Sequence, residues 1–542
     1  MNTIEAEGLK GSKAGASPVR PTRAGVIDIG SNSIRLVIGE RQGEKLRVLE
    51  SLRTPVPIGQ EVFRTNTVSP AVVSHVLATL ERYRQTLAEY DVKTLRTVAT
   101  TALREARNRE VILDSIRRKS GLDVAVLTAG DVVYYYDAYL FFRMSKVLPV
   151  RQQTILTAEL GAGTSDFSVM RRGTVLATVG LPLGMLRLTR LIERAGAEPH
   201  VAGNVLREYV ETELAGLRRQ LPRVALQSIV LFSEHLVPSL GAVLGWSRRP
   251  LSDSPGGSAS GLVRLKRRQA EELWNRCRGR SAAELVDTHK LAPDVAETLV
   301  ATSATVAALL KAFELDELFV VQTSLGEALL TYTLFELGRA ERYNKLRQQL
   351  SVARALCFRH GADLKHARRV SSFARRLFAG LAGRLGLEPE DLNYLVIAAH
   401  LHDIGKFISA GAHHKHSEYL ISALNLFRLD AGEVRLIACI ARYHRRSTPR
   451  ESHPLYASLP PPARVKVQKL AALLRVADAL DRSHTGRVEE LAVRVADECT
   501  IELRVRAAAD PLLERLAVEE KKNLLCEISG CEVRLIVERG PQ

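Results

Sequence analysis

The sequence predicts an α/β protein built from two similar halves, followed by an all-helical domain and a small α/β domain. Two stretches indicate the duplication, because residues 25–38 and 154–170 share one pattern: an apolar strand, a polar turn with glycine, and a second apolar strand. Long amphipathic segments with clustered histidines indicate the helical domain. Alternating strand and helix patterns return after residue 488.

The first half is expected to span residues 24–137. Residues 1–23 mix small, proline and basic residues that cannot pack a core, so we expect a disordered tail there. After the first hairpin, the pattern predicts a helix over 69–90, a strand over 95–99, a helix over 103–120 and a strand over 124–128. This alternation is typical of an α/β domain.

The second half is expected to span residues 138–340. Its hairpin is followed by predicted helices over 187–194, 202–220 and 292–313 and by strands over 228–232 and 318–322. The helical domain then covers 341–487. In the last segment, 488–542, we expect strands over 489–495, 500–506 and 532–538 and a helix over 510–521.

The amino-acid composition indicates what kind of partner the protein binds and in which compartment it lies. The 542 residues carry a formal charge of +17 and a pI near 9.7, which favours a polyanionic partner. Aromatic residues make up only 5%, which argues against base stacking on nucleic acid. The six cysteines form no CxxC pair, and no run of 18 apolar residues exists, so we expect a cytoplasmic protein without a membrane span.

The turn of the first hairpin is suited to phosphate. Gly30 lets the backbone approach a ligand closely, and Asp28 at the end of the strand is placed to hold hydrated Mg²⁺. Hydroxyl, amide and guanidinium groups that suit phosphate oxygens follow at Ser31, Asn32, Ser33 and Arg35. An ordinary hairpin with a polar turn is the alternative for this stretch taken alone.

The second hairpin repeats this arrangement. Glu159 ends its first strand and Asp166 opens its second. The turn between them offers candidate phosphate-binding residues at Gly161, Gly163, Thr164 and Ser165. Two such turns are typical of a duplicated fold that holds a phosphate chain from both sides of a cleft.

These loops, together with residues 97–108 and 180–189, resemble the Ppx/GppA family of exopolyphosphatases and guanosine pentaphosphate phosphatases. The resemblance implies a duplicated actin-like (ASKHA, ribonuclease H-like) fold over about residues 24–335. It also implies Mg²⁺ in the cleft, held by Asp28 and Glu159, and a homodimer formed through the C-terminal helical half.

The sequence departs from that family at its catalytic motif. The family's Gly-x-Glu-Glu-Ala-Arg is replaced by residues 129–134, in which Asp131 is the remaining candidate base, with Glu159 as the second candidate. The usual Gly-Gly-Thr turn is replaced by Ser233, Glu234 and His235, and a glutamate there would repel phosphate. Together these changes indicate weakened or altered phosphatase chemistry.

The histidine-rich region resembles the metal signature of HD phosphohydrolases. His366, His402, Asp403 and Asp478 match the ligands of the first metal, and His416 and His444 match additional ligands of dinuclear members. Mixed imidazoles and carboxylates suit Mn²⁺, Fe or a similar divalent metal. For His413 the expected role is structural.

The leading hypothesis is therefore a Mg²⁺-dependent phosphohydrolase that cleaves terminal phosphoanhydride bonds of inorganic polyphosphate or guanosine pentaphosphate in the cleft. The alternative places catalysis in the HD-type domain, as a metal-dependent nucleotide phosphohydrolase, with the cleft as a degenerate phosphate sensor. A regulator without either activity is a third possibility. The sequence leaves the choice between the phosphate substrates open.

Overall fold

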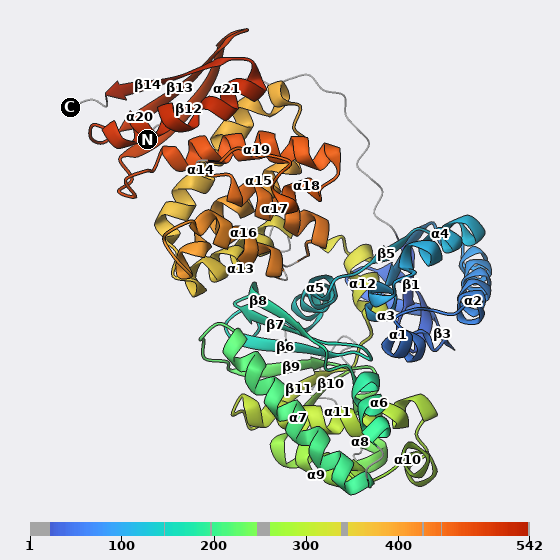
Figure 1. The fold of residues 1–542 in the computed structure, drawn as a ribbon. Helices are drawn as coiled ribbons and strands as arrows, with labels where there is room; N and C mark the ends of the chain where they lie inside the picture. Colours follow the sequence, from blue (N-terminus) through green and yellow to red (C-terminus); the bar gives the residue numbers. More distant parts are fainter. Residues whose placement is uncertain are drawn as a thin grey trace.

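The computed structural model describes residues 22–145, 147–195, 198–245, 261–337, 345–424, 426, 428–445 and 447–539. They form two α/β units beside a lobe of helices that is extended by a small sheet (Figure 1). The tail expected over residues 1–23 lies outside the described residues apart from its last two, and Arg23 already belongs to the first strand.

The first unit contains a five-stranded sheet in the order β3-β2-β1-β4-β5. The strands are β1 (Arg23–Ile29), β2 (Ser33–Gln42), β3 (Lys45–Pro55), β4 (Thr94–Ala99) and β5 (Val124–Val126). The first three pair antiparallel, whereas β4 and β5 continue the sheet in parallel. Hydrogen bonds between strands therefore place the turn after β1 at the same sheet edge as the end of β4.

Helices cover this sheet as α1 (Ile58–Thr65), α2 (Pro70–Glu89), α3 (Thr101–Glu105) and α4 (Arg109–Ser120). Helix α5 (Ala129–Tyr139) follows in the chain but packs on the sheet of the second unit. The Ser69 hydroxyl caps α2, as the predicted helix start implies. The single helix expected over 103–120 is wrong, because α3 and α4 are separate. Asn108 lies between them, and its side-chain amide exchanges hydrogen bonds of 3.1 and 2.9 Å with the backbone of Val68.

The second unit repeats this plan in a six-stranded sheet of order β10-β11-β9-β6-β7-β8. Its strands are β6 (Thr154–Leu160), β7 (Ser165–Arg171), β8 (Thr174–Leu181), β9 (Ser228–Phe232), β10 (Leu262–Lys266) and β11 (Glu317–Val321). Its helices are α6 (Met185–Ala195), α7 (Pro199–Gln220), α8 (Leu236–Leu244), α9 (Arg267–Cys277), α10 (Ala282–His289) and α11 (Pro293–Ala312). Again an antiparallel meander, β6-β7-β8, is joined to parallel strands.

Helix α12 (Leu325–Leu334) links the two units. It follows β11 in the chain, inside the predicted second half, yet it packs against β1 and β2 of the first unit and against α5. Its apolar residues Leu329 and Leu330 are buried in the same cluster as Val26 and Val37. The structural boundary between the two units therefore does not follow the order of the chain at this helix.

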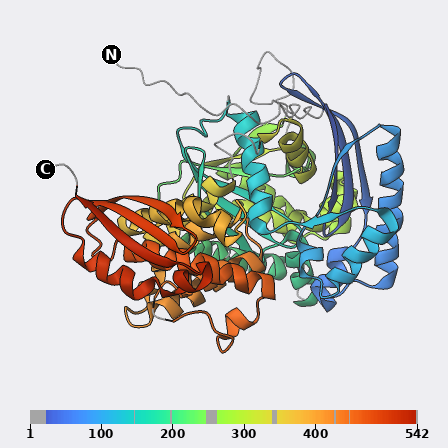
Figure 2. The same cartoon turned by 90° about the horizontal axis from the view of Figure 1, so that it is seen from above.

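The helical lobe contains α13 (Lys345–Arg359), α14 (Leu364–Leu385), α15 (Asp391–Leu401), α16 (His413–Ala423), α17 (Ala431–Arg442), α18 (Pro454–Ala457) and α19 (Pro461–Ala479). A three-stranded sheet follows, with β12 (Val488–Asp497), β13 (Thr500–Ala507) and β14 (Glu532–Arg539) and helices α20 (Leu512–Lys521) and α21 (Asn523–Ser529). Leu473 of the helices and Leu503 of the sheet belong to one buried cluster, so both parts share a core (Figure 2).

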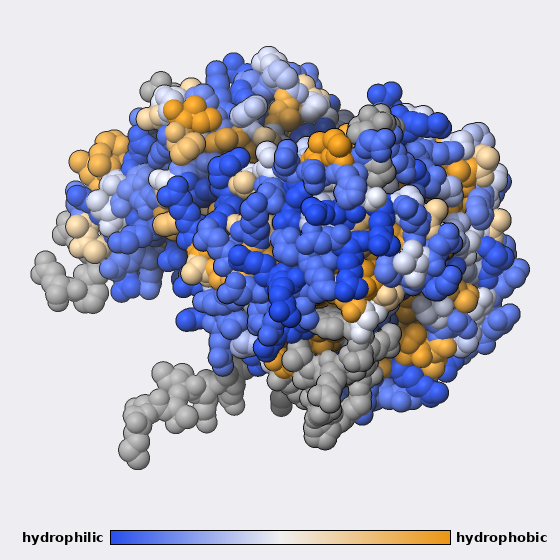
Figure 3. Space-filling view, turned by 90° about the horizontal axis from the view of Figure 1, so that it is seen from below, coloured by the Kyte–Doolittle hydropathy of each residue, from blue (hydrophilic) through white to orange (hydrophobic). Residues whose placement is uncertain are grey.

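Helix α11 is the one helix among the described residues that is long and apolar enough to cross a membrane. Its most apolar window is 61% buried inside the second unit, which is typical of a core helix. Figure 3 shows that one face of the molecule is mainly hydrophilic, with apolar side chains in separate patches.

Candidate active site and metal centre

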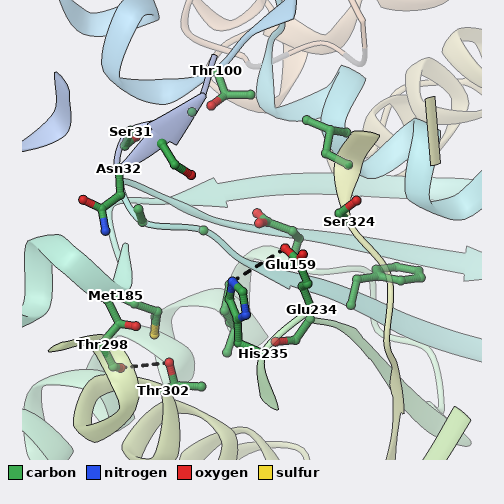
Figure 4. A pocket seen from close by; sticks show the side chains of 18 of the residues that line it. Ser31, Asn32, Thr100, Glu159, Met185, Glu234, His235, Thr298, Thr302 and Ser324 are labelled. Atoms are coloured by element: carbon green, nitrogen blue, oxygen red, sulfur yellow. Dashed lines mark hydrogen bonds and ion pairs between the residues drawn. The ribbon is translucent and has the colours of Figure 1, made fainter. Parts of the chain in front are cut away.

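The turns of the two hairpins face each other across a cavity of about 220 Å³ (Figure 4). Both turns lie at the ends of buried strands, because the pairing of β1 with β2 and of β6 with β7 stops where the polar residues begin. The predicted site residues that line this cavity are Asp28, Ser31, Asn32, Ser33, Arg35, Glu159, Gly161 and Thr164. The structure thus brings together residues from two stretches more than a hundred positions apart.

Two predicted phosphate-binding residues lie behind this wall. Ser165 is fully buried and donates a 2.5 Å hydrogen bond to the carbonyl of Leu183. Gly163 packs against Thr101, where an added Cβ would lie 2.6 Å from the Thr101 methyl group. Both residues shape the turn from behind, and neither is among those that line the cavity.

A close backbone contact explains the glycine of the 180–189 segment. A Cβ on Gly184 would lie 2.2 Å from the carbonyl carbon of Gly163, so only glycine fits where this segment crosses the turn. Backbone hydrogen bonds reinforce the contact, with Met185 N donating to Gly161 O at 2.8 Å. The start of α6 thereby fixes the shape of the second phosphate turn.

Two buried carboxylates, Asp28 and Asp166, and the half-buried Glu159 give the cavity its electrostatic character. Burial raises the pKa of Asp28 to about 6, although Arg35 opposes the shift. Burial also raises the pKa of Asp166 to about 6. For Glu159, burial and then the nearby charges of Asp166 and Asp28 raise the pKa well above its ordinary value. The protein alone therefore stabilises these negative charges poorly.

These residues fit a divalent cation with oxygen ligands. One oxygen of Asp28 and one of Asp166 are buried without a hydrogen-bond partner among the described residues. Orphaned buried carboxylate oxygens are costly unless a cation meets them. Mg²⁺ is usually held by one or two carboxylates together with water and substrate phosphates, and the set around Asp28 and Glu159 meets that requirement.

Asp131, the other predicted catalytic residue, lies outside the cavity wall. Its carboxylate accepts from the Thr128 hydroxyl at 2.8 Å and from the Thr128 backbone at 3.0 Å, which caps α5. It also accepts from Arg428 Nε at 2.8 Å. From the following turn of α5, Val132 and Tyr136 line the cavity instead. The interpretation of Asp131 as the water-activating base is not supported by this geometry.

The altered third turn places a carboxylate on the phosphate-binding arginine. Glu234 Oε2 lies 2.5 Å from Arg35 Nη1, and His235 Nε2 lies 3.2 Å from Arg35 Nη2. Arg53, which we did not predict, also lines the cavity and pairs with Asp294 at the start of α11. Only strand register could have indicated Arg53, because β3 places it directly opposite Arg35.

Comparison with known proteins decides the family. Residues 36–334 match the Ppx/GppA phosphatase family, and residues 348–523 match domain III of Ppx/GppA phosphatases. The chain belongs to the Ppx/GppA phosphatase family. The family and the enzyme class predicted from the two loops, a phosphatase, are thereby confirmed.

Individual relatives of this Ppx/GppA phosphatase are distant. A guanosine-5'-triphosphate,3'-diphosphate pyrophosphatase of Aliivibrio fischeri is 20% identical over 78% of this chain and 81% of its own length. Exopolyphosphatase 2 of Mycobacterium tuberculosis is 28% identical over 37% of this chain and 66% of its own length. The crystal structure of an exopolyphosphatase from Cytophaga hutchinsonii, 19% identical, covers 58% of this chain and 98% of that chain with a TM-score of 0.51. This likeness supports the predicted actin-like fold of the two units.

This Ppx/GppA phosphatase has a second cluster of titratable residues inside its helical lobe. Three overlapping groups could each hold a metal ion: His366, His402 and Asp478; His366, Asp403 and His484; and His402, Asp403 and His444. All but His484 are buried. Five of the six predicted ligands are therefore brought together: His366, His402, Asp403, His444 and Asp478.

His413 contacts this cluster, whereas no contact of the predicted ligand His416 with it is found among the described residues. His413 Nε2 lies 3.2 Å from Asp403 Oδ1 and 3.2 Å from His444 Nε2. Neither His413 nor His416 belongs to the three groups found in the described part of the chain. Helix α16 begins at His413, and His416 follows three residues later, a rise of about 4.5 Å along the helix axis.

Backbone carbonyls fix the histidine tautomers in this cluster. The Nδ1 atoms of His402, His413 and His444 lie 2.7–3.0 Å from the carbonyl oxygens of Ala399, Ala410 and Ala441. A carbonyl only accepts, so Nδ1 carries the proton and Nε2 keeps a lone pair when the ring is neutral. His402 Nε2 is buried without a hydrogen-bond partner in the described structure and lies 3.5 Å from Asp478 Oδ1, which fits a metal ligand.

Two residues that the sequence reasoning missed complete this cluster. Asp481 Oδ2 lies 2.7 Å from His366 Nδ1 and orients that ring from behind. Lys521, from the C-terminal α20, forms an ion pair with Asp478. The cluster thus includes residues of both the helices and the C-terminal α/β segment.

Proposed function

We propose that the cleft between the two α/β units hydrolyses the terminal phosphoanhydride bond of inorganic polyphosphate or guanosine pentaphosphate in a Mg²⁺-dependent reaction. One observation supports this most strongly: the strand ends of both units place phosphate-binding groups and orphaned carboxylates around one cavity. The names of the relatives, an exopolyphosphatase and a guanosine-5'-triphosphate,3'-diphosphate pyrophosphatase, agree with these substrates.

In this proposal, residues of the chain bind and orient the phosphate groups, and one residue takes a proton from the attacking water. Ser31, Asn32 and Thr164 donate to phosphate oxygens from the two turns, and Arg35 adds a planar cation. Glu159 is the remaining candidate base, because it lines the cavity whereas Asp131 does not. Bound Mg²⁺, held by Asp28 and Glu159, would neutralise phosphate charge and favour the ionised carboxylates.

The test is phosphate release from long-chain polyphosphate and from guanosine pentaphosphate with Mg²⁺. Asp28→Asn removes a carboxylate from the cavity and is expected to abolish release from both substrates. Asp114→Asn is the matched control, because Asp114 is exposed on α4 and pairs only with Arg118 in the described structure. Unchanged release by Asp28→Asn would overturn the proposal.

The helical lobe supports a second candidate function, a metal-dependent nucleotide phosphohydrolase of HD type with the cleft as a phosphate sensor. The supporting observation is the convergence of Nε2 lone pairs and carboxylates, which suits Mn²⁺ or Fe. His402→Ala is expected to abolish Mn²⁺-dependent release in this case and to leave Mg²⁺-dependent release unchanged in the first. The cytoplasmic location, the homodimer and the absence of a nucleic-acid partner stay predictions.

A further inference from the structure

One row of the first sheet carries three charged residues side by side. Strand register pairs Asp28 of β1 with Arg35 of β2, and Arg35 with Arg53 of β3. All three side chains line the cavity between the two units. The row therefore begins with the carboxylate of Asp28, which suits a metal ion, and continues with the neighbouring guanidinium groups of Arg35 and Arg53.

Two arginines directly opposite each other on antiparallel strands repel one another unless anions lie between or beside them. Here each arginine has its own anion from the second unit. Glu234 lies 2.5 Å from Arg35, and Asp294 pairs with Arg53. Both ion pairs cross the cavity, so they also join the two units at its rim.

The second arginine is tied to the predicted phosphate turn. Arg53 Nε donates to the Ser33 hydroxyl at 3.2 Å, so its guanidinium lies beside the turn that holds Ser31 and Asn32. Both arginine side chains are partly exposed, 21% for Arg35 and 30% for Arg53, and so are their carboxylate partners. An anion from solution can therefore reach both guanidinium groups.

We propose that Arg35 and Arg53 form a clamp for two consecutive phosphates, and that Glu234 and Asp294 compete with the substrate for this clamp. The order of these residues along the row assigns a position to each of the two phosphates. The terminal phosphate lies at Asp28 and Arg35, and the next phosphate of the chain lies at Arg53. This inference rests on the proposed function, because it assigns the second phosphate of the same substrate.

The carboxylates then set the affinity for substrate. A phosphate chain gains its contacts with the arginines only after it displaces Glu234 and Asp294, so part of its binding free energy is lost in that exchange. Removing either negative charge without changing the side-chain shape should therefore tighten binding. Glu234 covers Arg35, and Asp294 covers Arg53. Removing one or the other carboxylate should therefore have different effects on a ligand with one phosphate and on a ligand with two.

Equilibrium binding by calorimetry, with Mg²⁺ present, tests this with two probes, inorganic phosphate and pyrophosphate. Glu234→Gln is expected to tighten binding of both probes about fivefold, which corresponds to about 1 kcal/mol. Asp294→Asn is expected to tighten pyrophosphate binding to a similar extent and to leave phosphate binding unchanged. Arg53→Met should reduce pyrophosphate affinity to that of phosphate.

Glu297→Gln is the matched control. Glu297 lies on the same helix as Asp294 and pairs with Arg190, but it does not line the cavity. It is expected to bind both probes as the wild type does. Thermal unfolding of each variant shows whether the fold is retained.

The outcomes separate the two proposals. If the wild type and every variant bind neither probe, the cleft is not a phosphate site and the proposed function fails together with the clamp. If the wild type binds pyrophosphate but Asp294→Asn and Arg53→Met bind it equally well, only the clamp is overturned. Equal tightening of phosphate and pyrophosphate by Asp294→Asn would overturn the assigned direction of the row.

Discussion

Arg428 of the helical lobe donates its Nε to the carboxylate of Asp131 across a distance of 2.8 Å, although 297 positions separate the two residues. The same guanidinium lies 4.1 Å from the ring centroid of Tyr134. Both partners belong to α5, the helix whose Val132 and Tyr136 line the cleft. Helix α5 is thus held by the helical lobe on one side while it forms a wall of the candidate active site on the other (Figure 1).

This contact predicts that Asp131 is structural. Asp131→Asn is expected to keep turnover close to the wild-type rate, because the amide still caps α5 and the side chain lies outside the cavity. Glu159→Gln is expected to lower turnover about 100-fold or more, since it removes the remaining candidate base. The measurement is the rate of phosphate release with saturating Mg²⁺. A loss with Asp131→Asn as large as that with Glu159→Gln would restore Asp131 as the base.

The same contact should stabilise the junction between the lobes. Arg428→Met leaves the Asp131 carboxylate half-buried without its cation, and we expect a loss of about 3 kcal/mol in unfolding free energy. Arg435→Met is the control, because Arg435 is exposed on the neighbouring α17 and, in the part of the chain that the structure describes, makes only a local 3.1 Å hydrogen bond to Ala431 O. Chemical denaturation measures the unfolding free energy of both variants. Equal stability of the two variants would show that the contact contributes little.

Much of the fold could be predicted because its elements carry local signals. The strand over 228–232 coincides with β9, and the helix over 69–90 agrees with α2 to within one residue at each end, since the patterns that predict them act within a few positions. β3 was missed because its residues alternate between exposed and half-buried, and an edge strand of this kind lacks an apolar run. The place of α12 also escaped prediction, because its apolar residues do not reveal which unit they pack against.

The site was predictable only where motifs mark it. Asp28 and Arg35 lie in the cavity as the first loop implied, but Arg53 carries no motif and enters it through strand register. The sequence could not reveal the contact of Asp131 with Arg428, because 297 positions separate the two residues. Among adjacent histidines, the sequence could not separate His413 from His416, since the helix start that decides between them depends on the turn at Ala412, whose φ is +53°.

A buried carboxyl outside the cavity predicts how stability depends on pH. Asp137 of α5 is 3% exposed and accepts from the hydroxyls of Thr157 at 2.7 Å and Ser168 at 2.8 Å. Burial outweighs these bonds and raises the pKa of Asp137 to about 7. A raised carboxyl pKa favours the protonated native state. Its stabilisation is therefore complete below the unfolded pKa and is lost as the pH rises through about 7.

We expect the unfolding free energy of the wild type to fall between pH 5 and pH 8, with a contribution of about 3 kcal/mol from Asp137 over this range. Asp137→Asn, which cannot ionise, should remove this contribution and make the variant's curve flatter. Chemical denaturation at several pH values, with the same Mg²⁺ concentration throughout, measures the difference. Parallel curves for the two proteins would show that Asp137 ionises normally in the folded state.

The histidine cluster predicts which side chains retain a metal. His413 Nε2 and His444 Nε2 lie 3.2 Å apart, and both keep lone pairs when neutral, so their contact is repulsive unless a proton or a metal ion lies at the same place. Burial, and then the charge of His402, lowers the pKa of His444 well below its ordinary value, which disfavours the proton. A metal ion that also meets Asp403, 3.2 Å from His413 Nε2, resolves this contact.

We therefore expect protein loaded with Mn²⁺ and freed of excess metal to retain less Mn²⁺ as His413→Ala than as wild type, by elemental analysis. His416→Ala should retain the wild-type amount, which makes it a matched control three residues away on α16. The metal content is read independently of any activity, so the result does not depend on which substrate the enzyme uses. Loss of Mn²⁺ in His416→Ala but not in His413→Ala would restore His416 as the ligand. Equal retention by both variants would show that His413 is a structural neighbour of the ligands and not one of them.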